Sequence, residues 1–274
     1  MGGRHYWVDR IDPWFIHLYG PVGVRWYGLA YVLGIVVGAW IARRWVDAGR
    51  LPIGRADIYT LVTDAATGIV VGGRLGYCLF YARDIVLRDP LYIVEIWNGG
   101  MASHGGIVGL VVAMWLFARR RGLNPLLFTD LAVVTGPIGI AFGRIANFVN
   151  GELWGRPTMV PWAVIFPDAP PVDGVNVPRH PSQLYAAALE GGLVFAVAQW
   201  AHARYRRPGL ATAAGCLTYG IVRIIDEFWR SPDVGQPVYF GWLTKGQALS
   251  LPMVLIGIGL GVWCLRHRDA TRSG

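Results

Sequence analysis

An apolar run that begins near Leu127 leads directly into Gly143-Arg144-Ile145-Ala146-Asn147-Phe148-Val149-Asn150-Gly151-Glu152-Leu153-Trp154-Gly155-Arg156. Arg144 therefore lies within reach of lipid tails, where an ionised side chain is costly. Because a guanidinium does not lose its proton in proteins, it requires an anion or backbone carbonyls as partners. Helical spacing places Arg144 and Asn147 on one face, which Asn150 continues beyond the helix end. The stretch predicts a polar site at one end of a membrane-spanning helix.

The composition argues against a soluble protein. Of the 274 residues, 54% are hydrophobic and only 15% are charged, and 13 are tryptophans. This balance is typical of a helical protein with several membrane spans. The three cysteines lie in apolar runs without metal-ligand or redox spacing, so we expect neither a metal nor a cofactor. The net charge of +8 is divided among short loops, which argues against nucleic acid as a partner.

Seven apolar runs are long enough to cross, or nearly cross, a bilayer core of about 30 Å. They lie at residues 27–42, 58–81, 105–118, 127–148, 183–202, 210–229 and 248–265. The first and third runs are short and are expected to extend into their flanks. Residues 91–97 are too few to span and are expected to form an interfacial or re-entrant piece. The sequence therefore predicts an all-α integral membrane protein with a single polytopic domain over residues 1–274.

The arginines predict the orientation of these spans. Thirteen of the 25 basic residues lie close to span ends, in the loops after spans one, three and five and in the C-terminal tail, whereas nine lie on the opposite side. The positive-inside rule then places the C-terminus in the cytoplasm and, with seven spans, the N-terminus outside. The long loop at residues 149–182 contains seven prolines, which exclude a long helix. We expect a small extracytoplasmic insertion there.

The predicted topology gathers polar groups at the outer ends of the spans. The group consists of Arg74, Arg144 and Arg223 inside spans, with Tyr27, His104 and Glu152 at span ends. Guanidinium groups outnumber the carboxylates expected to offset them, Glu152 and Glu227. The group therefore requires an external anion, and a phosphate in the outer leaflet suits planar guanidinium forks.

The sixth span carries a polar stripe. Tyr219, Arg223, Glu227 and Arg230 recur on one helical face, with Asp226 beside them. An internal ion-pair network that ties spans together explains this stripe, taken alone, as well as a ligand site does. Three arginines at one level favour the ligand site.

His104 is the side chain best suited to move a proton near neutral pH. A single histidine at a membrane interface is more often structural, but glycines at positions 99, 100, 105 and 106 strip side chains from its flanks, as expected beside a ligand. Asp64 and Glu190 lie well inside spans. We expect them to make helix–helix hydrogen bonds rather than to act in catalysis.

Seven blocks of the sequence resemble the bacterial prolipoprotein diacylglyceryl transferase family. They follow one another through nearly the whole chain, and their specificity comes from this order. The blocks are Arg25-Trp26-Tyr27-Gly28, Gly72-Gly73-Arg74-Leu75-Gly76-Tyr77, Ser103-His104-Gly105-Gly106, the segment from Gly143 to Glu152, His180-Pro181-Ser182-Gln183-Leu184-Tyr185, Tyr219-Gly220-Ile221-Val222-Arg223 with Glu227-Phe228, and Gly246-Gln247 with Leu249-Ser250-Leu251-Pro252-Met253. The proline-rich loop after Trp154 departs from the pattern.

The resemblance implies seven spans in the bacterial cytoplasmic (inner) membrane and an active site facing the extracytoplasmic leaflet. It implies transfer of the diacylglyceryl group of phosphatidylglycerol onto the lipobox cysteine of a preprolipoprotein. A thioether forms and glycerol phosphate leaves, in the first step of lipoprotein maturation. The expected partners are phosphatidylglycerol, the lipobox segment and membrane lipid. The substrate supplies the thiol, which fits the lack of a candidate nucleophilic cysteine in this chain.

For this reaction, Arg144 and Arg223 are expected to stabilise the charge that grows on the leaving phosphate, with Asn147 as a hydrogen-bond donor. His104 is the expected thiol base, although Tyr27 or Tyr219 could share that role. Glu152 is expected to orient Arg144 or the headgroup. The expected phosphatidylglycerol site comprises Arg74, Arg144, Asn147, Glu152, Gly155, Arg223 and Glu227.

A membrane carrier for an anionic lipid or solute is the alternative function, since buried arginines suit it equally well. The odd number of spans, the lack of inverted repeats and the gathering of polar groups at one face argue against a carrier. An intramembrane protease would require a catalytic pair or a metal motif, and none stands out.

Overall fold

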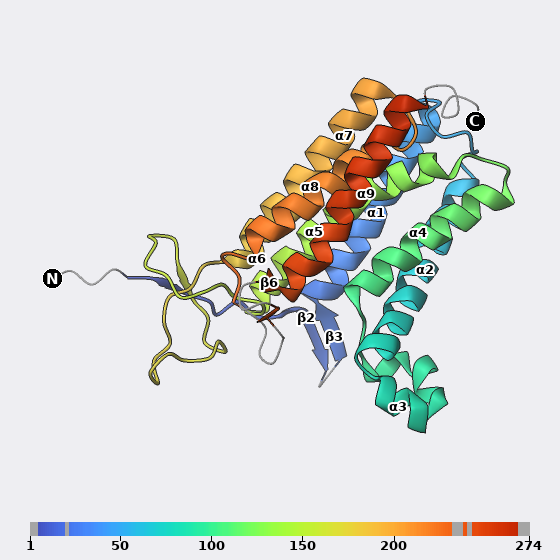
Figure 1. Ribbon diagram of the computed structural model, residues 1–274. Helices are drawn as coiled ribbons and strands as arrows, with labels where there is room; N and C mark the ends of the chain where they lie inside the picture. Colours follow the sequence, from blue (N-terminus) through green and yellow to red (C-terminus); the bar gives the residue numbers. More distant parts are fainter. Residues whose placement is uncertain (1–4, 20–21, 232–237, 240–242, 268–274) are drawn as a thin grey trace. The chain divides into compact units, whose positions relative to one another are not determined.

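The computed structural model describes residues 5–19, 22–231, 238–239 and 243–267, and most of them are helical (Figure 1). Each predicted apolar run coincides with a helix apart from a few end residues. The helices are α1 (Trp26–Asp47), α2 (Asp57–Phe80), α4 (Ser103–Arg120), α5 (Pro125–Val149), α8 (Leu210–Asp226) and α9 (Lys245–Arg266), together with a continuous helix made of α6 (Ser182–Ala186), the π-helical η3 (Ala187–Leu193) and α7 (Val194–Tyr205). The two short runs extend into their flanks as α1 and α4, as expected.

Four of these helices are long and apolar enough to cross a membrane: Trp26–Asp47, Pro125–Val149, Ser182–Tyr205 and Gly246–Arg266. The chain thus has the helices of a membrane protein. Among the remaining three, α2 contains two aspartates and an arginine, and α8 has only 17 residues. The count of seven spans stays a prediction.

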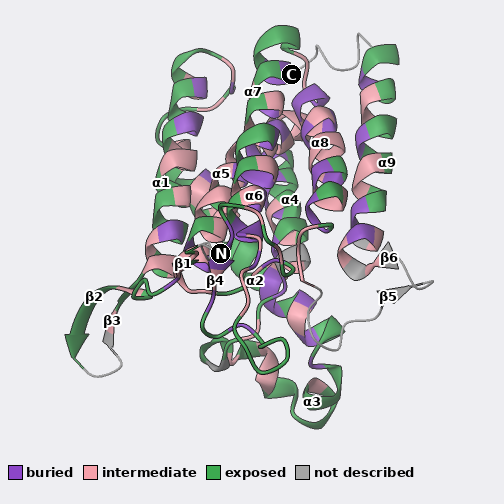
Figure 2. Ribbon diagram, turned by 90° about the vertical axis from the view of Figure 1, so that its left-hand side faces the viewer, coloured by how far each residue is buried: buried purple, intermediate pink, exposed green. Residues whose placement is uncertain are grey.

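Exposed residues recur along several of the long helices (Figure 2), and many of them are large and apolar. On α1, Tyr31, Val36 and Trp40 are exposed, and on α9, Leu255 is 68% exposed. Monomeric soluble proteins rarely expose apolar side chains in such number, whereas lipid tails solvate them well. These faces are therefore suited to contact lipid.

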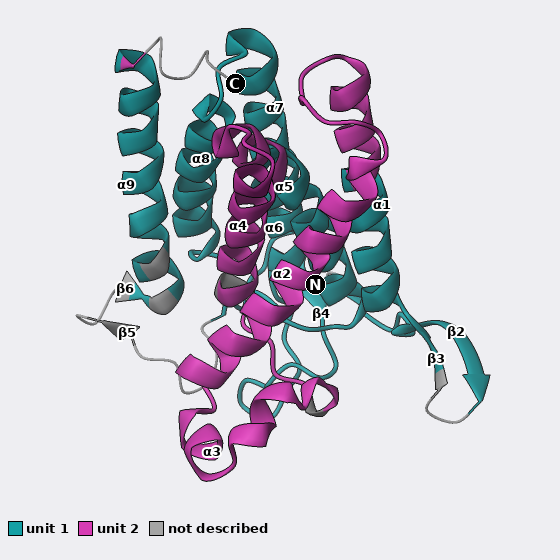
Figure 3. Ribbon diagram, turned by 90° about the vertical axis from the view of Figure 1, so that its right-hand side faces the viewer, with its two compact units in different colours: residues 1–38, 133–266 teal, residues 39–132, 267–274 magenta. Residues whose placement is uncertain are grey.

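The chain divides into two compact units (Figure 3), Met1–Gly38 with Val133–Arg266, and Ala39–Ala132 with His267–Gly274. In the second unit, α2 packs on α4 so closely that a Cβ added to Gly72 would collide with the backbone of Gly109. In the first unit, α8 packs on α7 and α9, and a Cβ on Gly257 would meet the backbone of Leu217. The expectation of one polytopic domain stays a prediction.

The segment predicted to be interfacial contains short helices. After α2 come α3 (Arg83–Arg88) and the 3-10 helices η1 (Pro90–Val94) and η2 (Ile96–Asn98). The side chains of Leu91 and Trp97 are exposed. A short helical segment with exposed apolar residues is compatible with an interfacial position.

The proline-rich loop contains no helix in its described residues 150–181, as its prolines predict. Its strand β4 (Val164–Ile165) pairs in parallel with β1 (Trp7–Val8). Val164, Phe166 and Ala169 are buried together against Phe148 and Trp154. This small apolar cluster holds the loop on the end of α5.

Two hairpins complete the described chain. Strands β2 (Trp14–Tyr19) and β3 (Val22–Arg25) pair in antiparallel fashion immediately before α1. Strands β5 (Val238–Tyr239) and β6 (Leu243–Thr244) do the same before α9. Each hairpin therefore precedes the first turn of a long helix.

Candidate active site

A buried carboxylate joins the two arginines that the sequence singled out. Glu190 is fully buried, and its Oε2 accepts hydrogen bonds from Arg144 Nη2 at 2.9 Å and from Arg144 Nε at 3.3 Å. Its Oε1 lies 3.4 Å from Arg223 Nε. Arg144 belongs to α5, Glu190 to η3 and Arg223 to α8. Three helices of the first unit therefore meet at one ionic cluster.

Arg223 has two further carboxylate neighbours on its own helix and just beyond it. Its Nη1 donates to Glu227 Oε2 at 2.7 Å and lies 3.7 Å from Asp226 Oδ2. The expected pairing of Arg223 with Glu227 is thus present. Lysine could not reproduce this arrangement, because a guanidinium directs its donors in several fixed directions at once.

The charge balance of this cluster corrects one step of the sequence argument. The positive excess predicted for the site does not exist around Arg144 and Arg223, because Glu190, Asp226 and Glu227 all lie within 4.0 Å of a guanidinium nitrogen. The polar stripe around Arg223 does form an ion-pair network that ties helices together, as its simpler interpretation predicted. Within the described residues, Arg144 Nη1 and Arg223 Nη2 still make no hydrogen bond or ion pair with protein.

Glu190 links helices, as expected, but its partners are residues of the candidate site. The sequence assigned it no role there, because Glu190 lies outside the recognised motifs, beyond the block that ends at Tyr185. The only local sign that this part of the chain packs closely on another helix is the neighbouring Gly191. A Cβ on Gly191 would lie 2.9 Å from the Cα of Ala141, so only glycine allows η3 to approach α5 this closely. Asp64, the other acid that the sequence placed inside a span, lies 3.4 Å from Arg120 and also links helices.

A second polar group forms where α5 ends. Gly151 has a φ of 63°, a left-handed conformation that reverses the chain and brings Glu152 back to the helix end. Glu152 accepts hydrogen bonds from Asn147 Nδ2 at 3.4 Å and from Asn150 Nδ2 at 3.2 Å. Asn147 also donates to the hydroxyl of Tyr27. The predicted residues Tyr27, Asn147 and Glu152 thus form one hydrogen-bonded chain. Among the described residues, the Glu152 carboxylate contacts these asparagines rather than Arg144.

The first turn of α9 lies against the Arg223–Glu227 pair. Thr244 and Gln247 form a reciprocal cap, in which each backbone N–H donates to the side chain of the other residue at 3.1 and 3.2 Å. This cap fixes Gly246, whose added Cβ would lie 2.8 Å from Glu227 Oε2 and 3.0 Å from Arg223 Nη2. No side chain fits at this position without displacing the ion pair.

We expect Gly246→Ala to lower the transfer rate roughly tenfold, because a misplacement of about 1 Å can cost about a hundredfold and the added Cβ requires a smaller shift than that. Thermal unfolding of the purified protein should change little, since the crowded atoms are side-chain ends. Gly259→Ala in the same helix is the matched control, because an added Cβ there meets nothing within 4 Å. Equal rates for the two variants would contradict the close packing inferred at Gly246.

Tyr219 lies one turn before Arg223 on α8, at intermediate exposure. The helix packs on α9 so closely there that a Cβ added to the adjacent Gly220 would lie 3.1 Å from the carbonyl oxygen of Ser250. Tyr219 therefore shares the helix that carries Arg223, and its hydroxyl makes no hydrogen bond that the structure records among the described residues.

Gly155 is packed among backbone atoms. Its N–H donates to the carbonyl of His180 at 2.9 Å, and an added Cβ would lie 2.7 Å from the carbonyl oxygen of Trp229. The sequence did not single out Arg179, which is buried and donates to the carbonyls of Gly155 and Pro170. Burial lowers the pKa of Arg179. Arg179 thus ties the loop together around Gly155.

His180 and its neighbours form a further cluster in the loop. Its Nδ1 lies 3.2 Å from the hydroxyl of Tyr185, which also accepts a hydrogen bond from Trp162 Nε1 at 2.6 Å. Burial lowers the pKa of His180 and favours the neutral imidazole. Next along the chain, Ser182 Oγ donates to the carbonyl of Leu153 at 3.0 Å. The block that begins at His180 therefore supports the chain just after Glu152.

Arg74 and His104 belong to the other compact unit. The Arg74 side chain is buried and donates to the carbonyls of Tyr92, Ile93, Gly99 and Gly100. Backbone oxygens thus satisfy this guanidinium within its own unit. His104 is the second residue of α4, and its side chain lies outside the described atoms. The expectation that both share one level with Arg144 stays a prediction.

Among the described residues, no group of three or more His, Cys, Asp or Glu side chains is arranged to hold a metal ion. Cys78 and Cys264 are buried, Cys216 is partly buried, and none forms a disulfide.

Comparison with known proteins assigns the family. Residues 13–263 match the family model described as prolipoprotein diacylglyceryl transferase. A phosphatidylglycerol–prolipoprotein diacylglyceryl transferase of Agrobacterium fabrum is 45% identical over 96% of this chain and 95% of its own. Proteins with the same name from Rhodospirillum centenum and Nitratidesulfovibrio vulgaris are 48% and 47% identical, over 90% and 94% of both chains. The chain therefore belongs to the prolipoprotein diacylglyceryl transferase family.

Proposed function

We propose that this protein transfers the diacylglyceryl group of phosphatidylglycerol to the lipobox cysteine of preprolipoproteins and releases glycerol phosphate. The observation that carries the proposal is the Arg144–Glu190–Arg223 cluster, found in a chain that matches transferases of this name along nearly its full length. Each guanidinium retains a terminal nitrogen without a protein partner among the described residues. These two nitrogens are the proposed contacts of the lipid phosphate.

The proposed reaction is a substitution at carbon. The thiolate sulfur of the substrate cysteine attacks the glycerol carbon that carries the phosphate ester. A carbon–sulfur bond forms as the carbon–oxygen bond breaks, and the bonding electrons leave with the phosphate oxygen. Negative charge therefore grows on the glycerol phosphate, where hydrogen bonds from Arg144 and Arg223 are most effective.

The hydrogen-bonded chain of Tyr27, Asn147 and Glu152 is proposed to hold the lipid headgroup beside this cluster. Asn147 stands one turn beyond Arg144 on α5, so both face the same side of the helix. Glu152, with two asparagine donors, is a fixed acceptor for the headgroup hydroxyls. Gly155 is proposed to act by letting the loop approach Trp229, on the segment just after Glu227.

The thiol proton requires a base, because a free thiol has a pKa of about 8.5. His104 is the proposed base, with Tyr27 or Tyr219 able to share the role. Arg74 is proposed to position His104, because its side chain anchors the segment at residues 92–100, which leads into the start of α4. Just before α4, Ala102 donates its N–H to the carbonyl of Gly73 at 2.9 Å. In this proposal Arg74 acts on the lipid site indirectly.

We expect His104→Asn to remove the acidic limb of the pH–rate profile, because loss of activity at low pH would report protonation of the imidazole. The measurement is kcat/KM for thioether formation as a function of pH, with His202→Asn as the control for a histidine on another helix. If the acidic limb were unchanged in His104→Asn, the base would be another group.

The proposed topology has seven spans, with the N-terminus outside, the C-terminus in the cytoplasm and residues 149–182 on the extracytoplasmic side of the inner membrane. The distribution of arginines and the coincidence of each apolar run with a helix support it. It places the cluster near the outer leaflet, since Arg144 and Arg223 lie close to the ends of α5 and α8 that lead to this side.

The function is tested by incubating the purified protein with phosphatidylglycerol labelled in its acyl chains and a lipobox peptide. Mass spectrometry should show the diacylglyceryl mass added to the peptide cysteine, and none on a peptide with serine in its place. Movement of the labelled lipid between leaflets of a vesicle without a covalent product would instead support the alternative, a carrier for an anionic lipid.

A further inference from the structure

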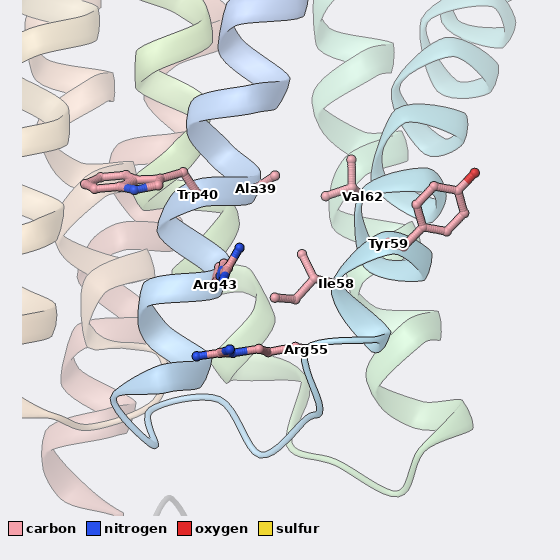
Figure 4. Close-up of a pocket in the computed structure, with 7 residues that line it drawn as sticks. All are labelled: Ala39, Trp40, Arg43, Arg55, Ile58, Tyr59 and Val62. Carbon is pink, nitrogen blue, oxygen red and sulfur yellow. The ribbon is translucent and has the colours of Figure 1, made fainter.

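The second unit contains a cavity far in sequence from the arginine cluster. It lies between the C-terminal half of α1 and the start of α2 and has a volume of about 550 Å³ (Figure 4). Its walls are formed by Ala39, Trp40, Arg43, Arg55, Ile58, Tyr59 and Val62. All seven belong to the same compact unit. The cavity therefore depends only on contacts within that unit.

The cavity has an apolar end and a basic end. Figure 4 shows Ala39 facing Val62 across the gap between the helices, with Arg43 and Ile58 in the next layer. Arg55 belongs to the loop that joins α1 to α2. A hydrocarbon chain fits the first end and an anion fits the second.

The basic end carries uncompensated positive charge. A single carboxylate, that of Asp47, pairs with both arginines: it lies 2.7 Å from Arg55 Nε and 4.0 Å from Arg43 Nε. Both guanidinium groups remain more than half exposed, at 60% and 64% of their side chains. Among the described residues no other carboxylate pairs with either, so the end of the cavity has a net charge of +1 and free guanidinium donors.

The aromatic residues at the rim match a position at the membrane surface. Trp40 and Tyr59 are 56% and 81% exposed, and these two residue types are enriched where lipid headgroups meet hydrocarbon. In the proposed topology this end of α1 is cytoplasmic, and the inner leaflet supplies anionic lipid there.

We propose that this cavity binds an anionic phospholipid of the cytoplasmic leaflet, with its phosphate on Arg43 and Arg55 and an acyl chain along Ala39, Ile58 and Val62. A free phosphate would use the basic end alone and leave the apolar wall without a role. The site is separate from the proposed substrate site, because its lipid enters from the opposite side of the membrane and is not consumed.

The test is native mass spectrometry of the full chain, titrated with phosphatidic acid, whose headgroup lacks the glycerol that the reaction releases. We expect the double variant Arg43→Gln/Arg55→Gln to lose one bound lipid, with an apparent affinity about tenfold weaker. Arg119→Gln is the matched control, because Arg119 belongs to the same unit and stacks on Trp115, at 5.3 Å from its ring, but lines no part of the cavity. It should bind lipid as the wild type does.

Two further measurements separate a lipid from a free anion. Val62→Trp fills the apolar end and keeps both arginines, so it should also lose the lipid, whereas Arg43→Lys/Arg55→Lys should retain most of the affinity. Phosphatidylcholine should not replace phosphatidic acid. Unchanged lipid binding by the glutamine variant or by Val62→Trp, or displacement of the lipid by millimolar inorganic phosphate, would overturn the proposal.

Discussion

Replacement of Arg144 by lysine is expected to reduce the rate of diacylglyceryl transfer by roughly a hundredfold, although lysine keeps the positive charge. Arg144 directs two nitrogens at one oxygen of Glu190 and has Nη1 left for a ligand. A lysine ammonium is a single nitrogen and cannot occupy both positions. The rate is measured by mass spectrometry of the peptide thioether at saturating phosphatidylglycerol.

Arg223→Lys is expected to fail for the same reason, since Arg223 contacts Glu190 through Nε and Glu227 through Nη1. Arg120→Lys is the control for both variants. It also changes an arginine that pairs with an acidic residue of another helix, Asp64, but it lies in the other compact unit. Its rate should stay within about twofold of the wild type. A wild-type rate in Arg144→Lys would show that one point charge is sufficient and that the fork geometry is unnecessary.

The sequence predicted the helices well because their signal is local. An apolar run of adequate length must form a helix in lipid, where every backbone N–H and C=O needs an internal partner. Each run therefore became a helix, and the proline-rich loop did not. The number of spans is harder to predict, because α2 and α8 carry charged residues whose cost depends on partners supplied by other helices.

The candidate site was predicted only in part. Arg144, Arg223 and Glu227 were identified because an arginine in an apolar run requires a partner, and Glu227 lies one turn from Arg223. Glu190 was assigned only a structural role, since nothing local says which helix face meets α5 and α8. Its position depends on the contact between Gly191 and Ala141, which are far apart in the sequence. The prediction of excess positive charge at the site was wrong because it left out the carboxylate of Glu190, which pairs with both Arg144 and Arg223.

Glu190→Gln is expected to be the most destabilising single substitution in the cluster. Glutamine has nearly the same shape, but it removes the negative charge shared by Arg144 and Arg223 and leaves Arg144 without a carboxylate among the described residues. Removal of one partner of a buried ion pair costs about 3–5 kcal/mol. We expect a corresponding loss in the free energy of unfolding, measured by denaturant titration of the protein in detergent, together with loss of transfer activity.

Glu227→Gln is the matched comparison, because it removes a carboxylate from Arg223 while Glu190 and Asp226 remain within 4.0 Å of that guanidinium. Its loss of stability should therefore be clearly smaller than that of Glu190→Gln. A double variant with leucine at positions 144 and 190 separates the two effects of Glu190, because Arg223 keeps Asp226 and Glu227 as partners. Replacing a buried ionic group by apolar residues as a whole is often neutral for stability. The double variant should therefore be more stable than Glu190→Gln and yet form no thioether, because Arg144 is required for the proposed reaction. If it proved less stable than Glu190→Gln, Glu190 would stabilise the fold through packing rather than by balancing the charge of the two arginines.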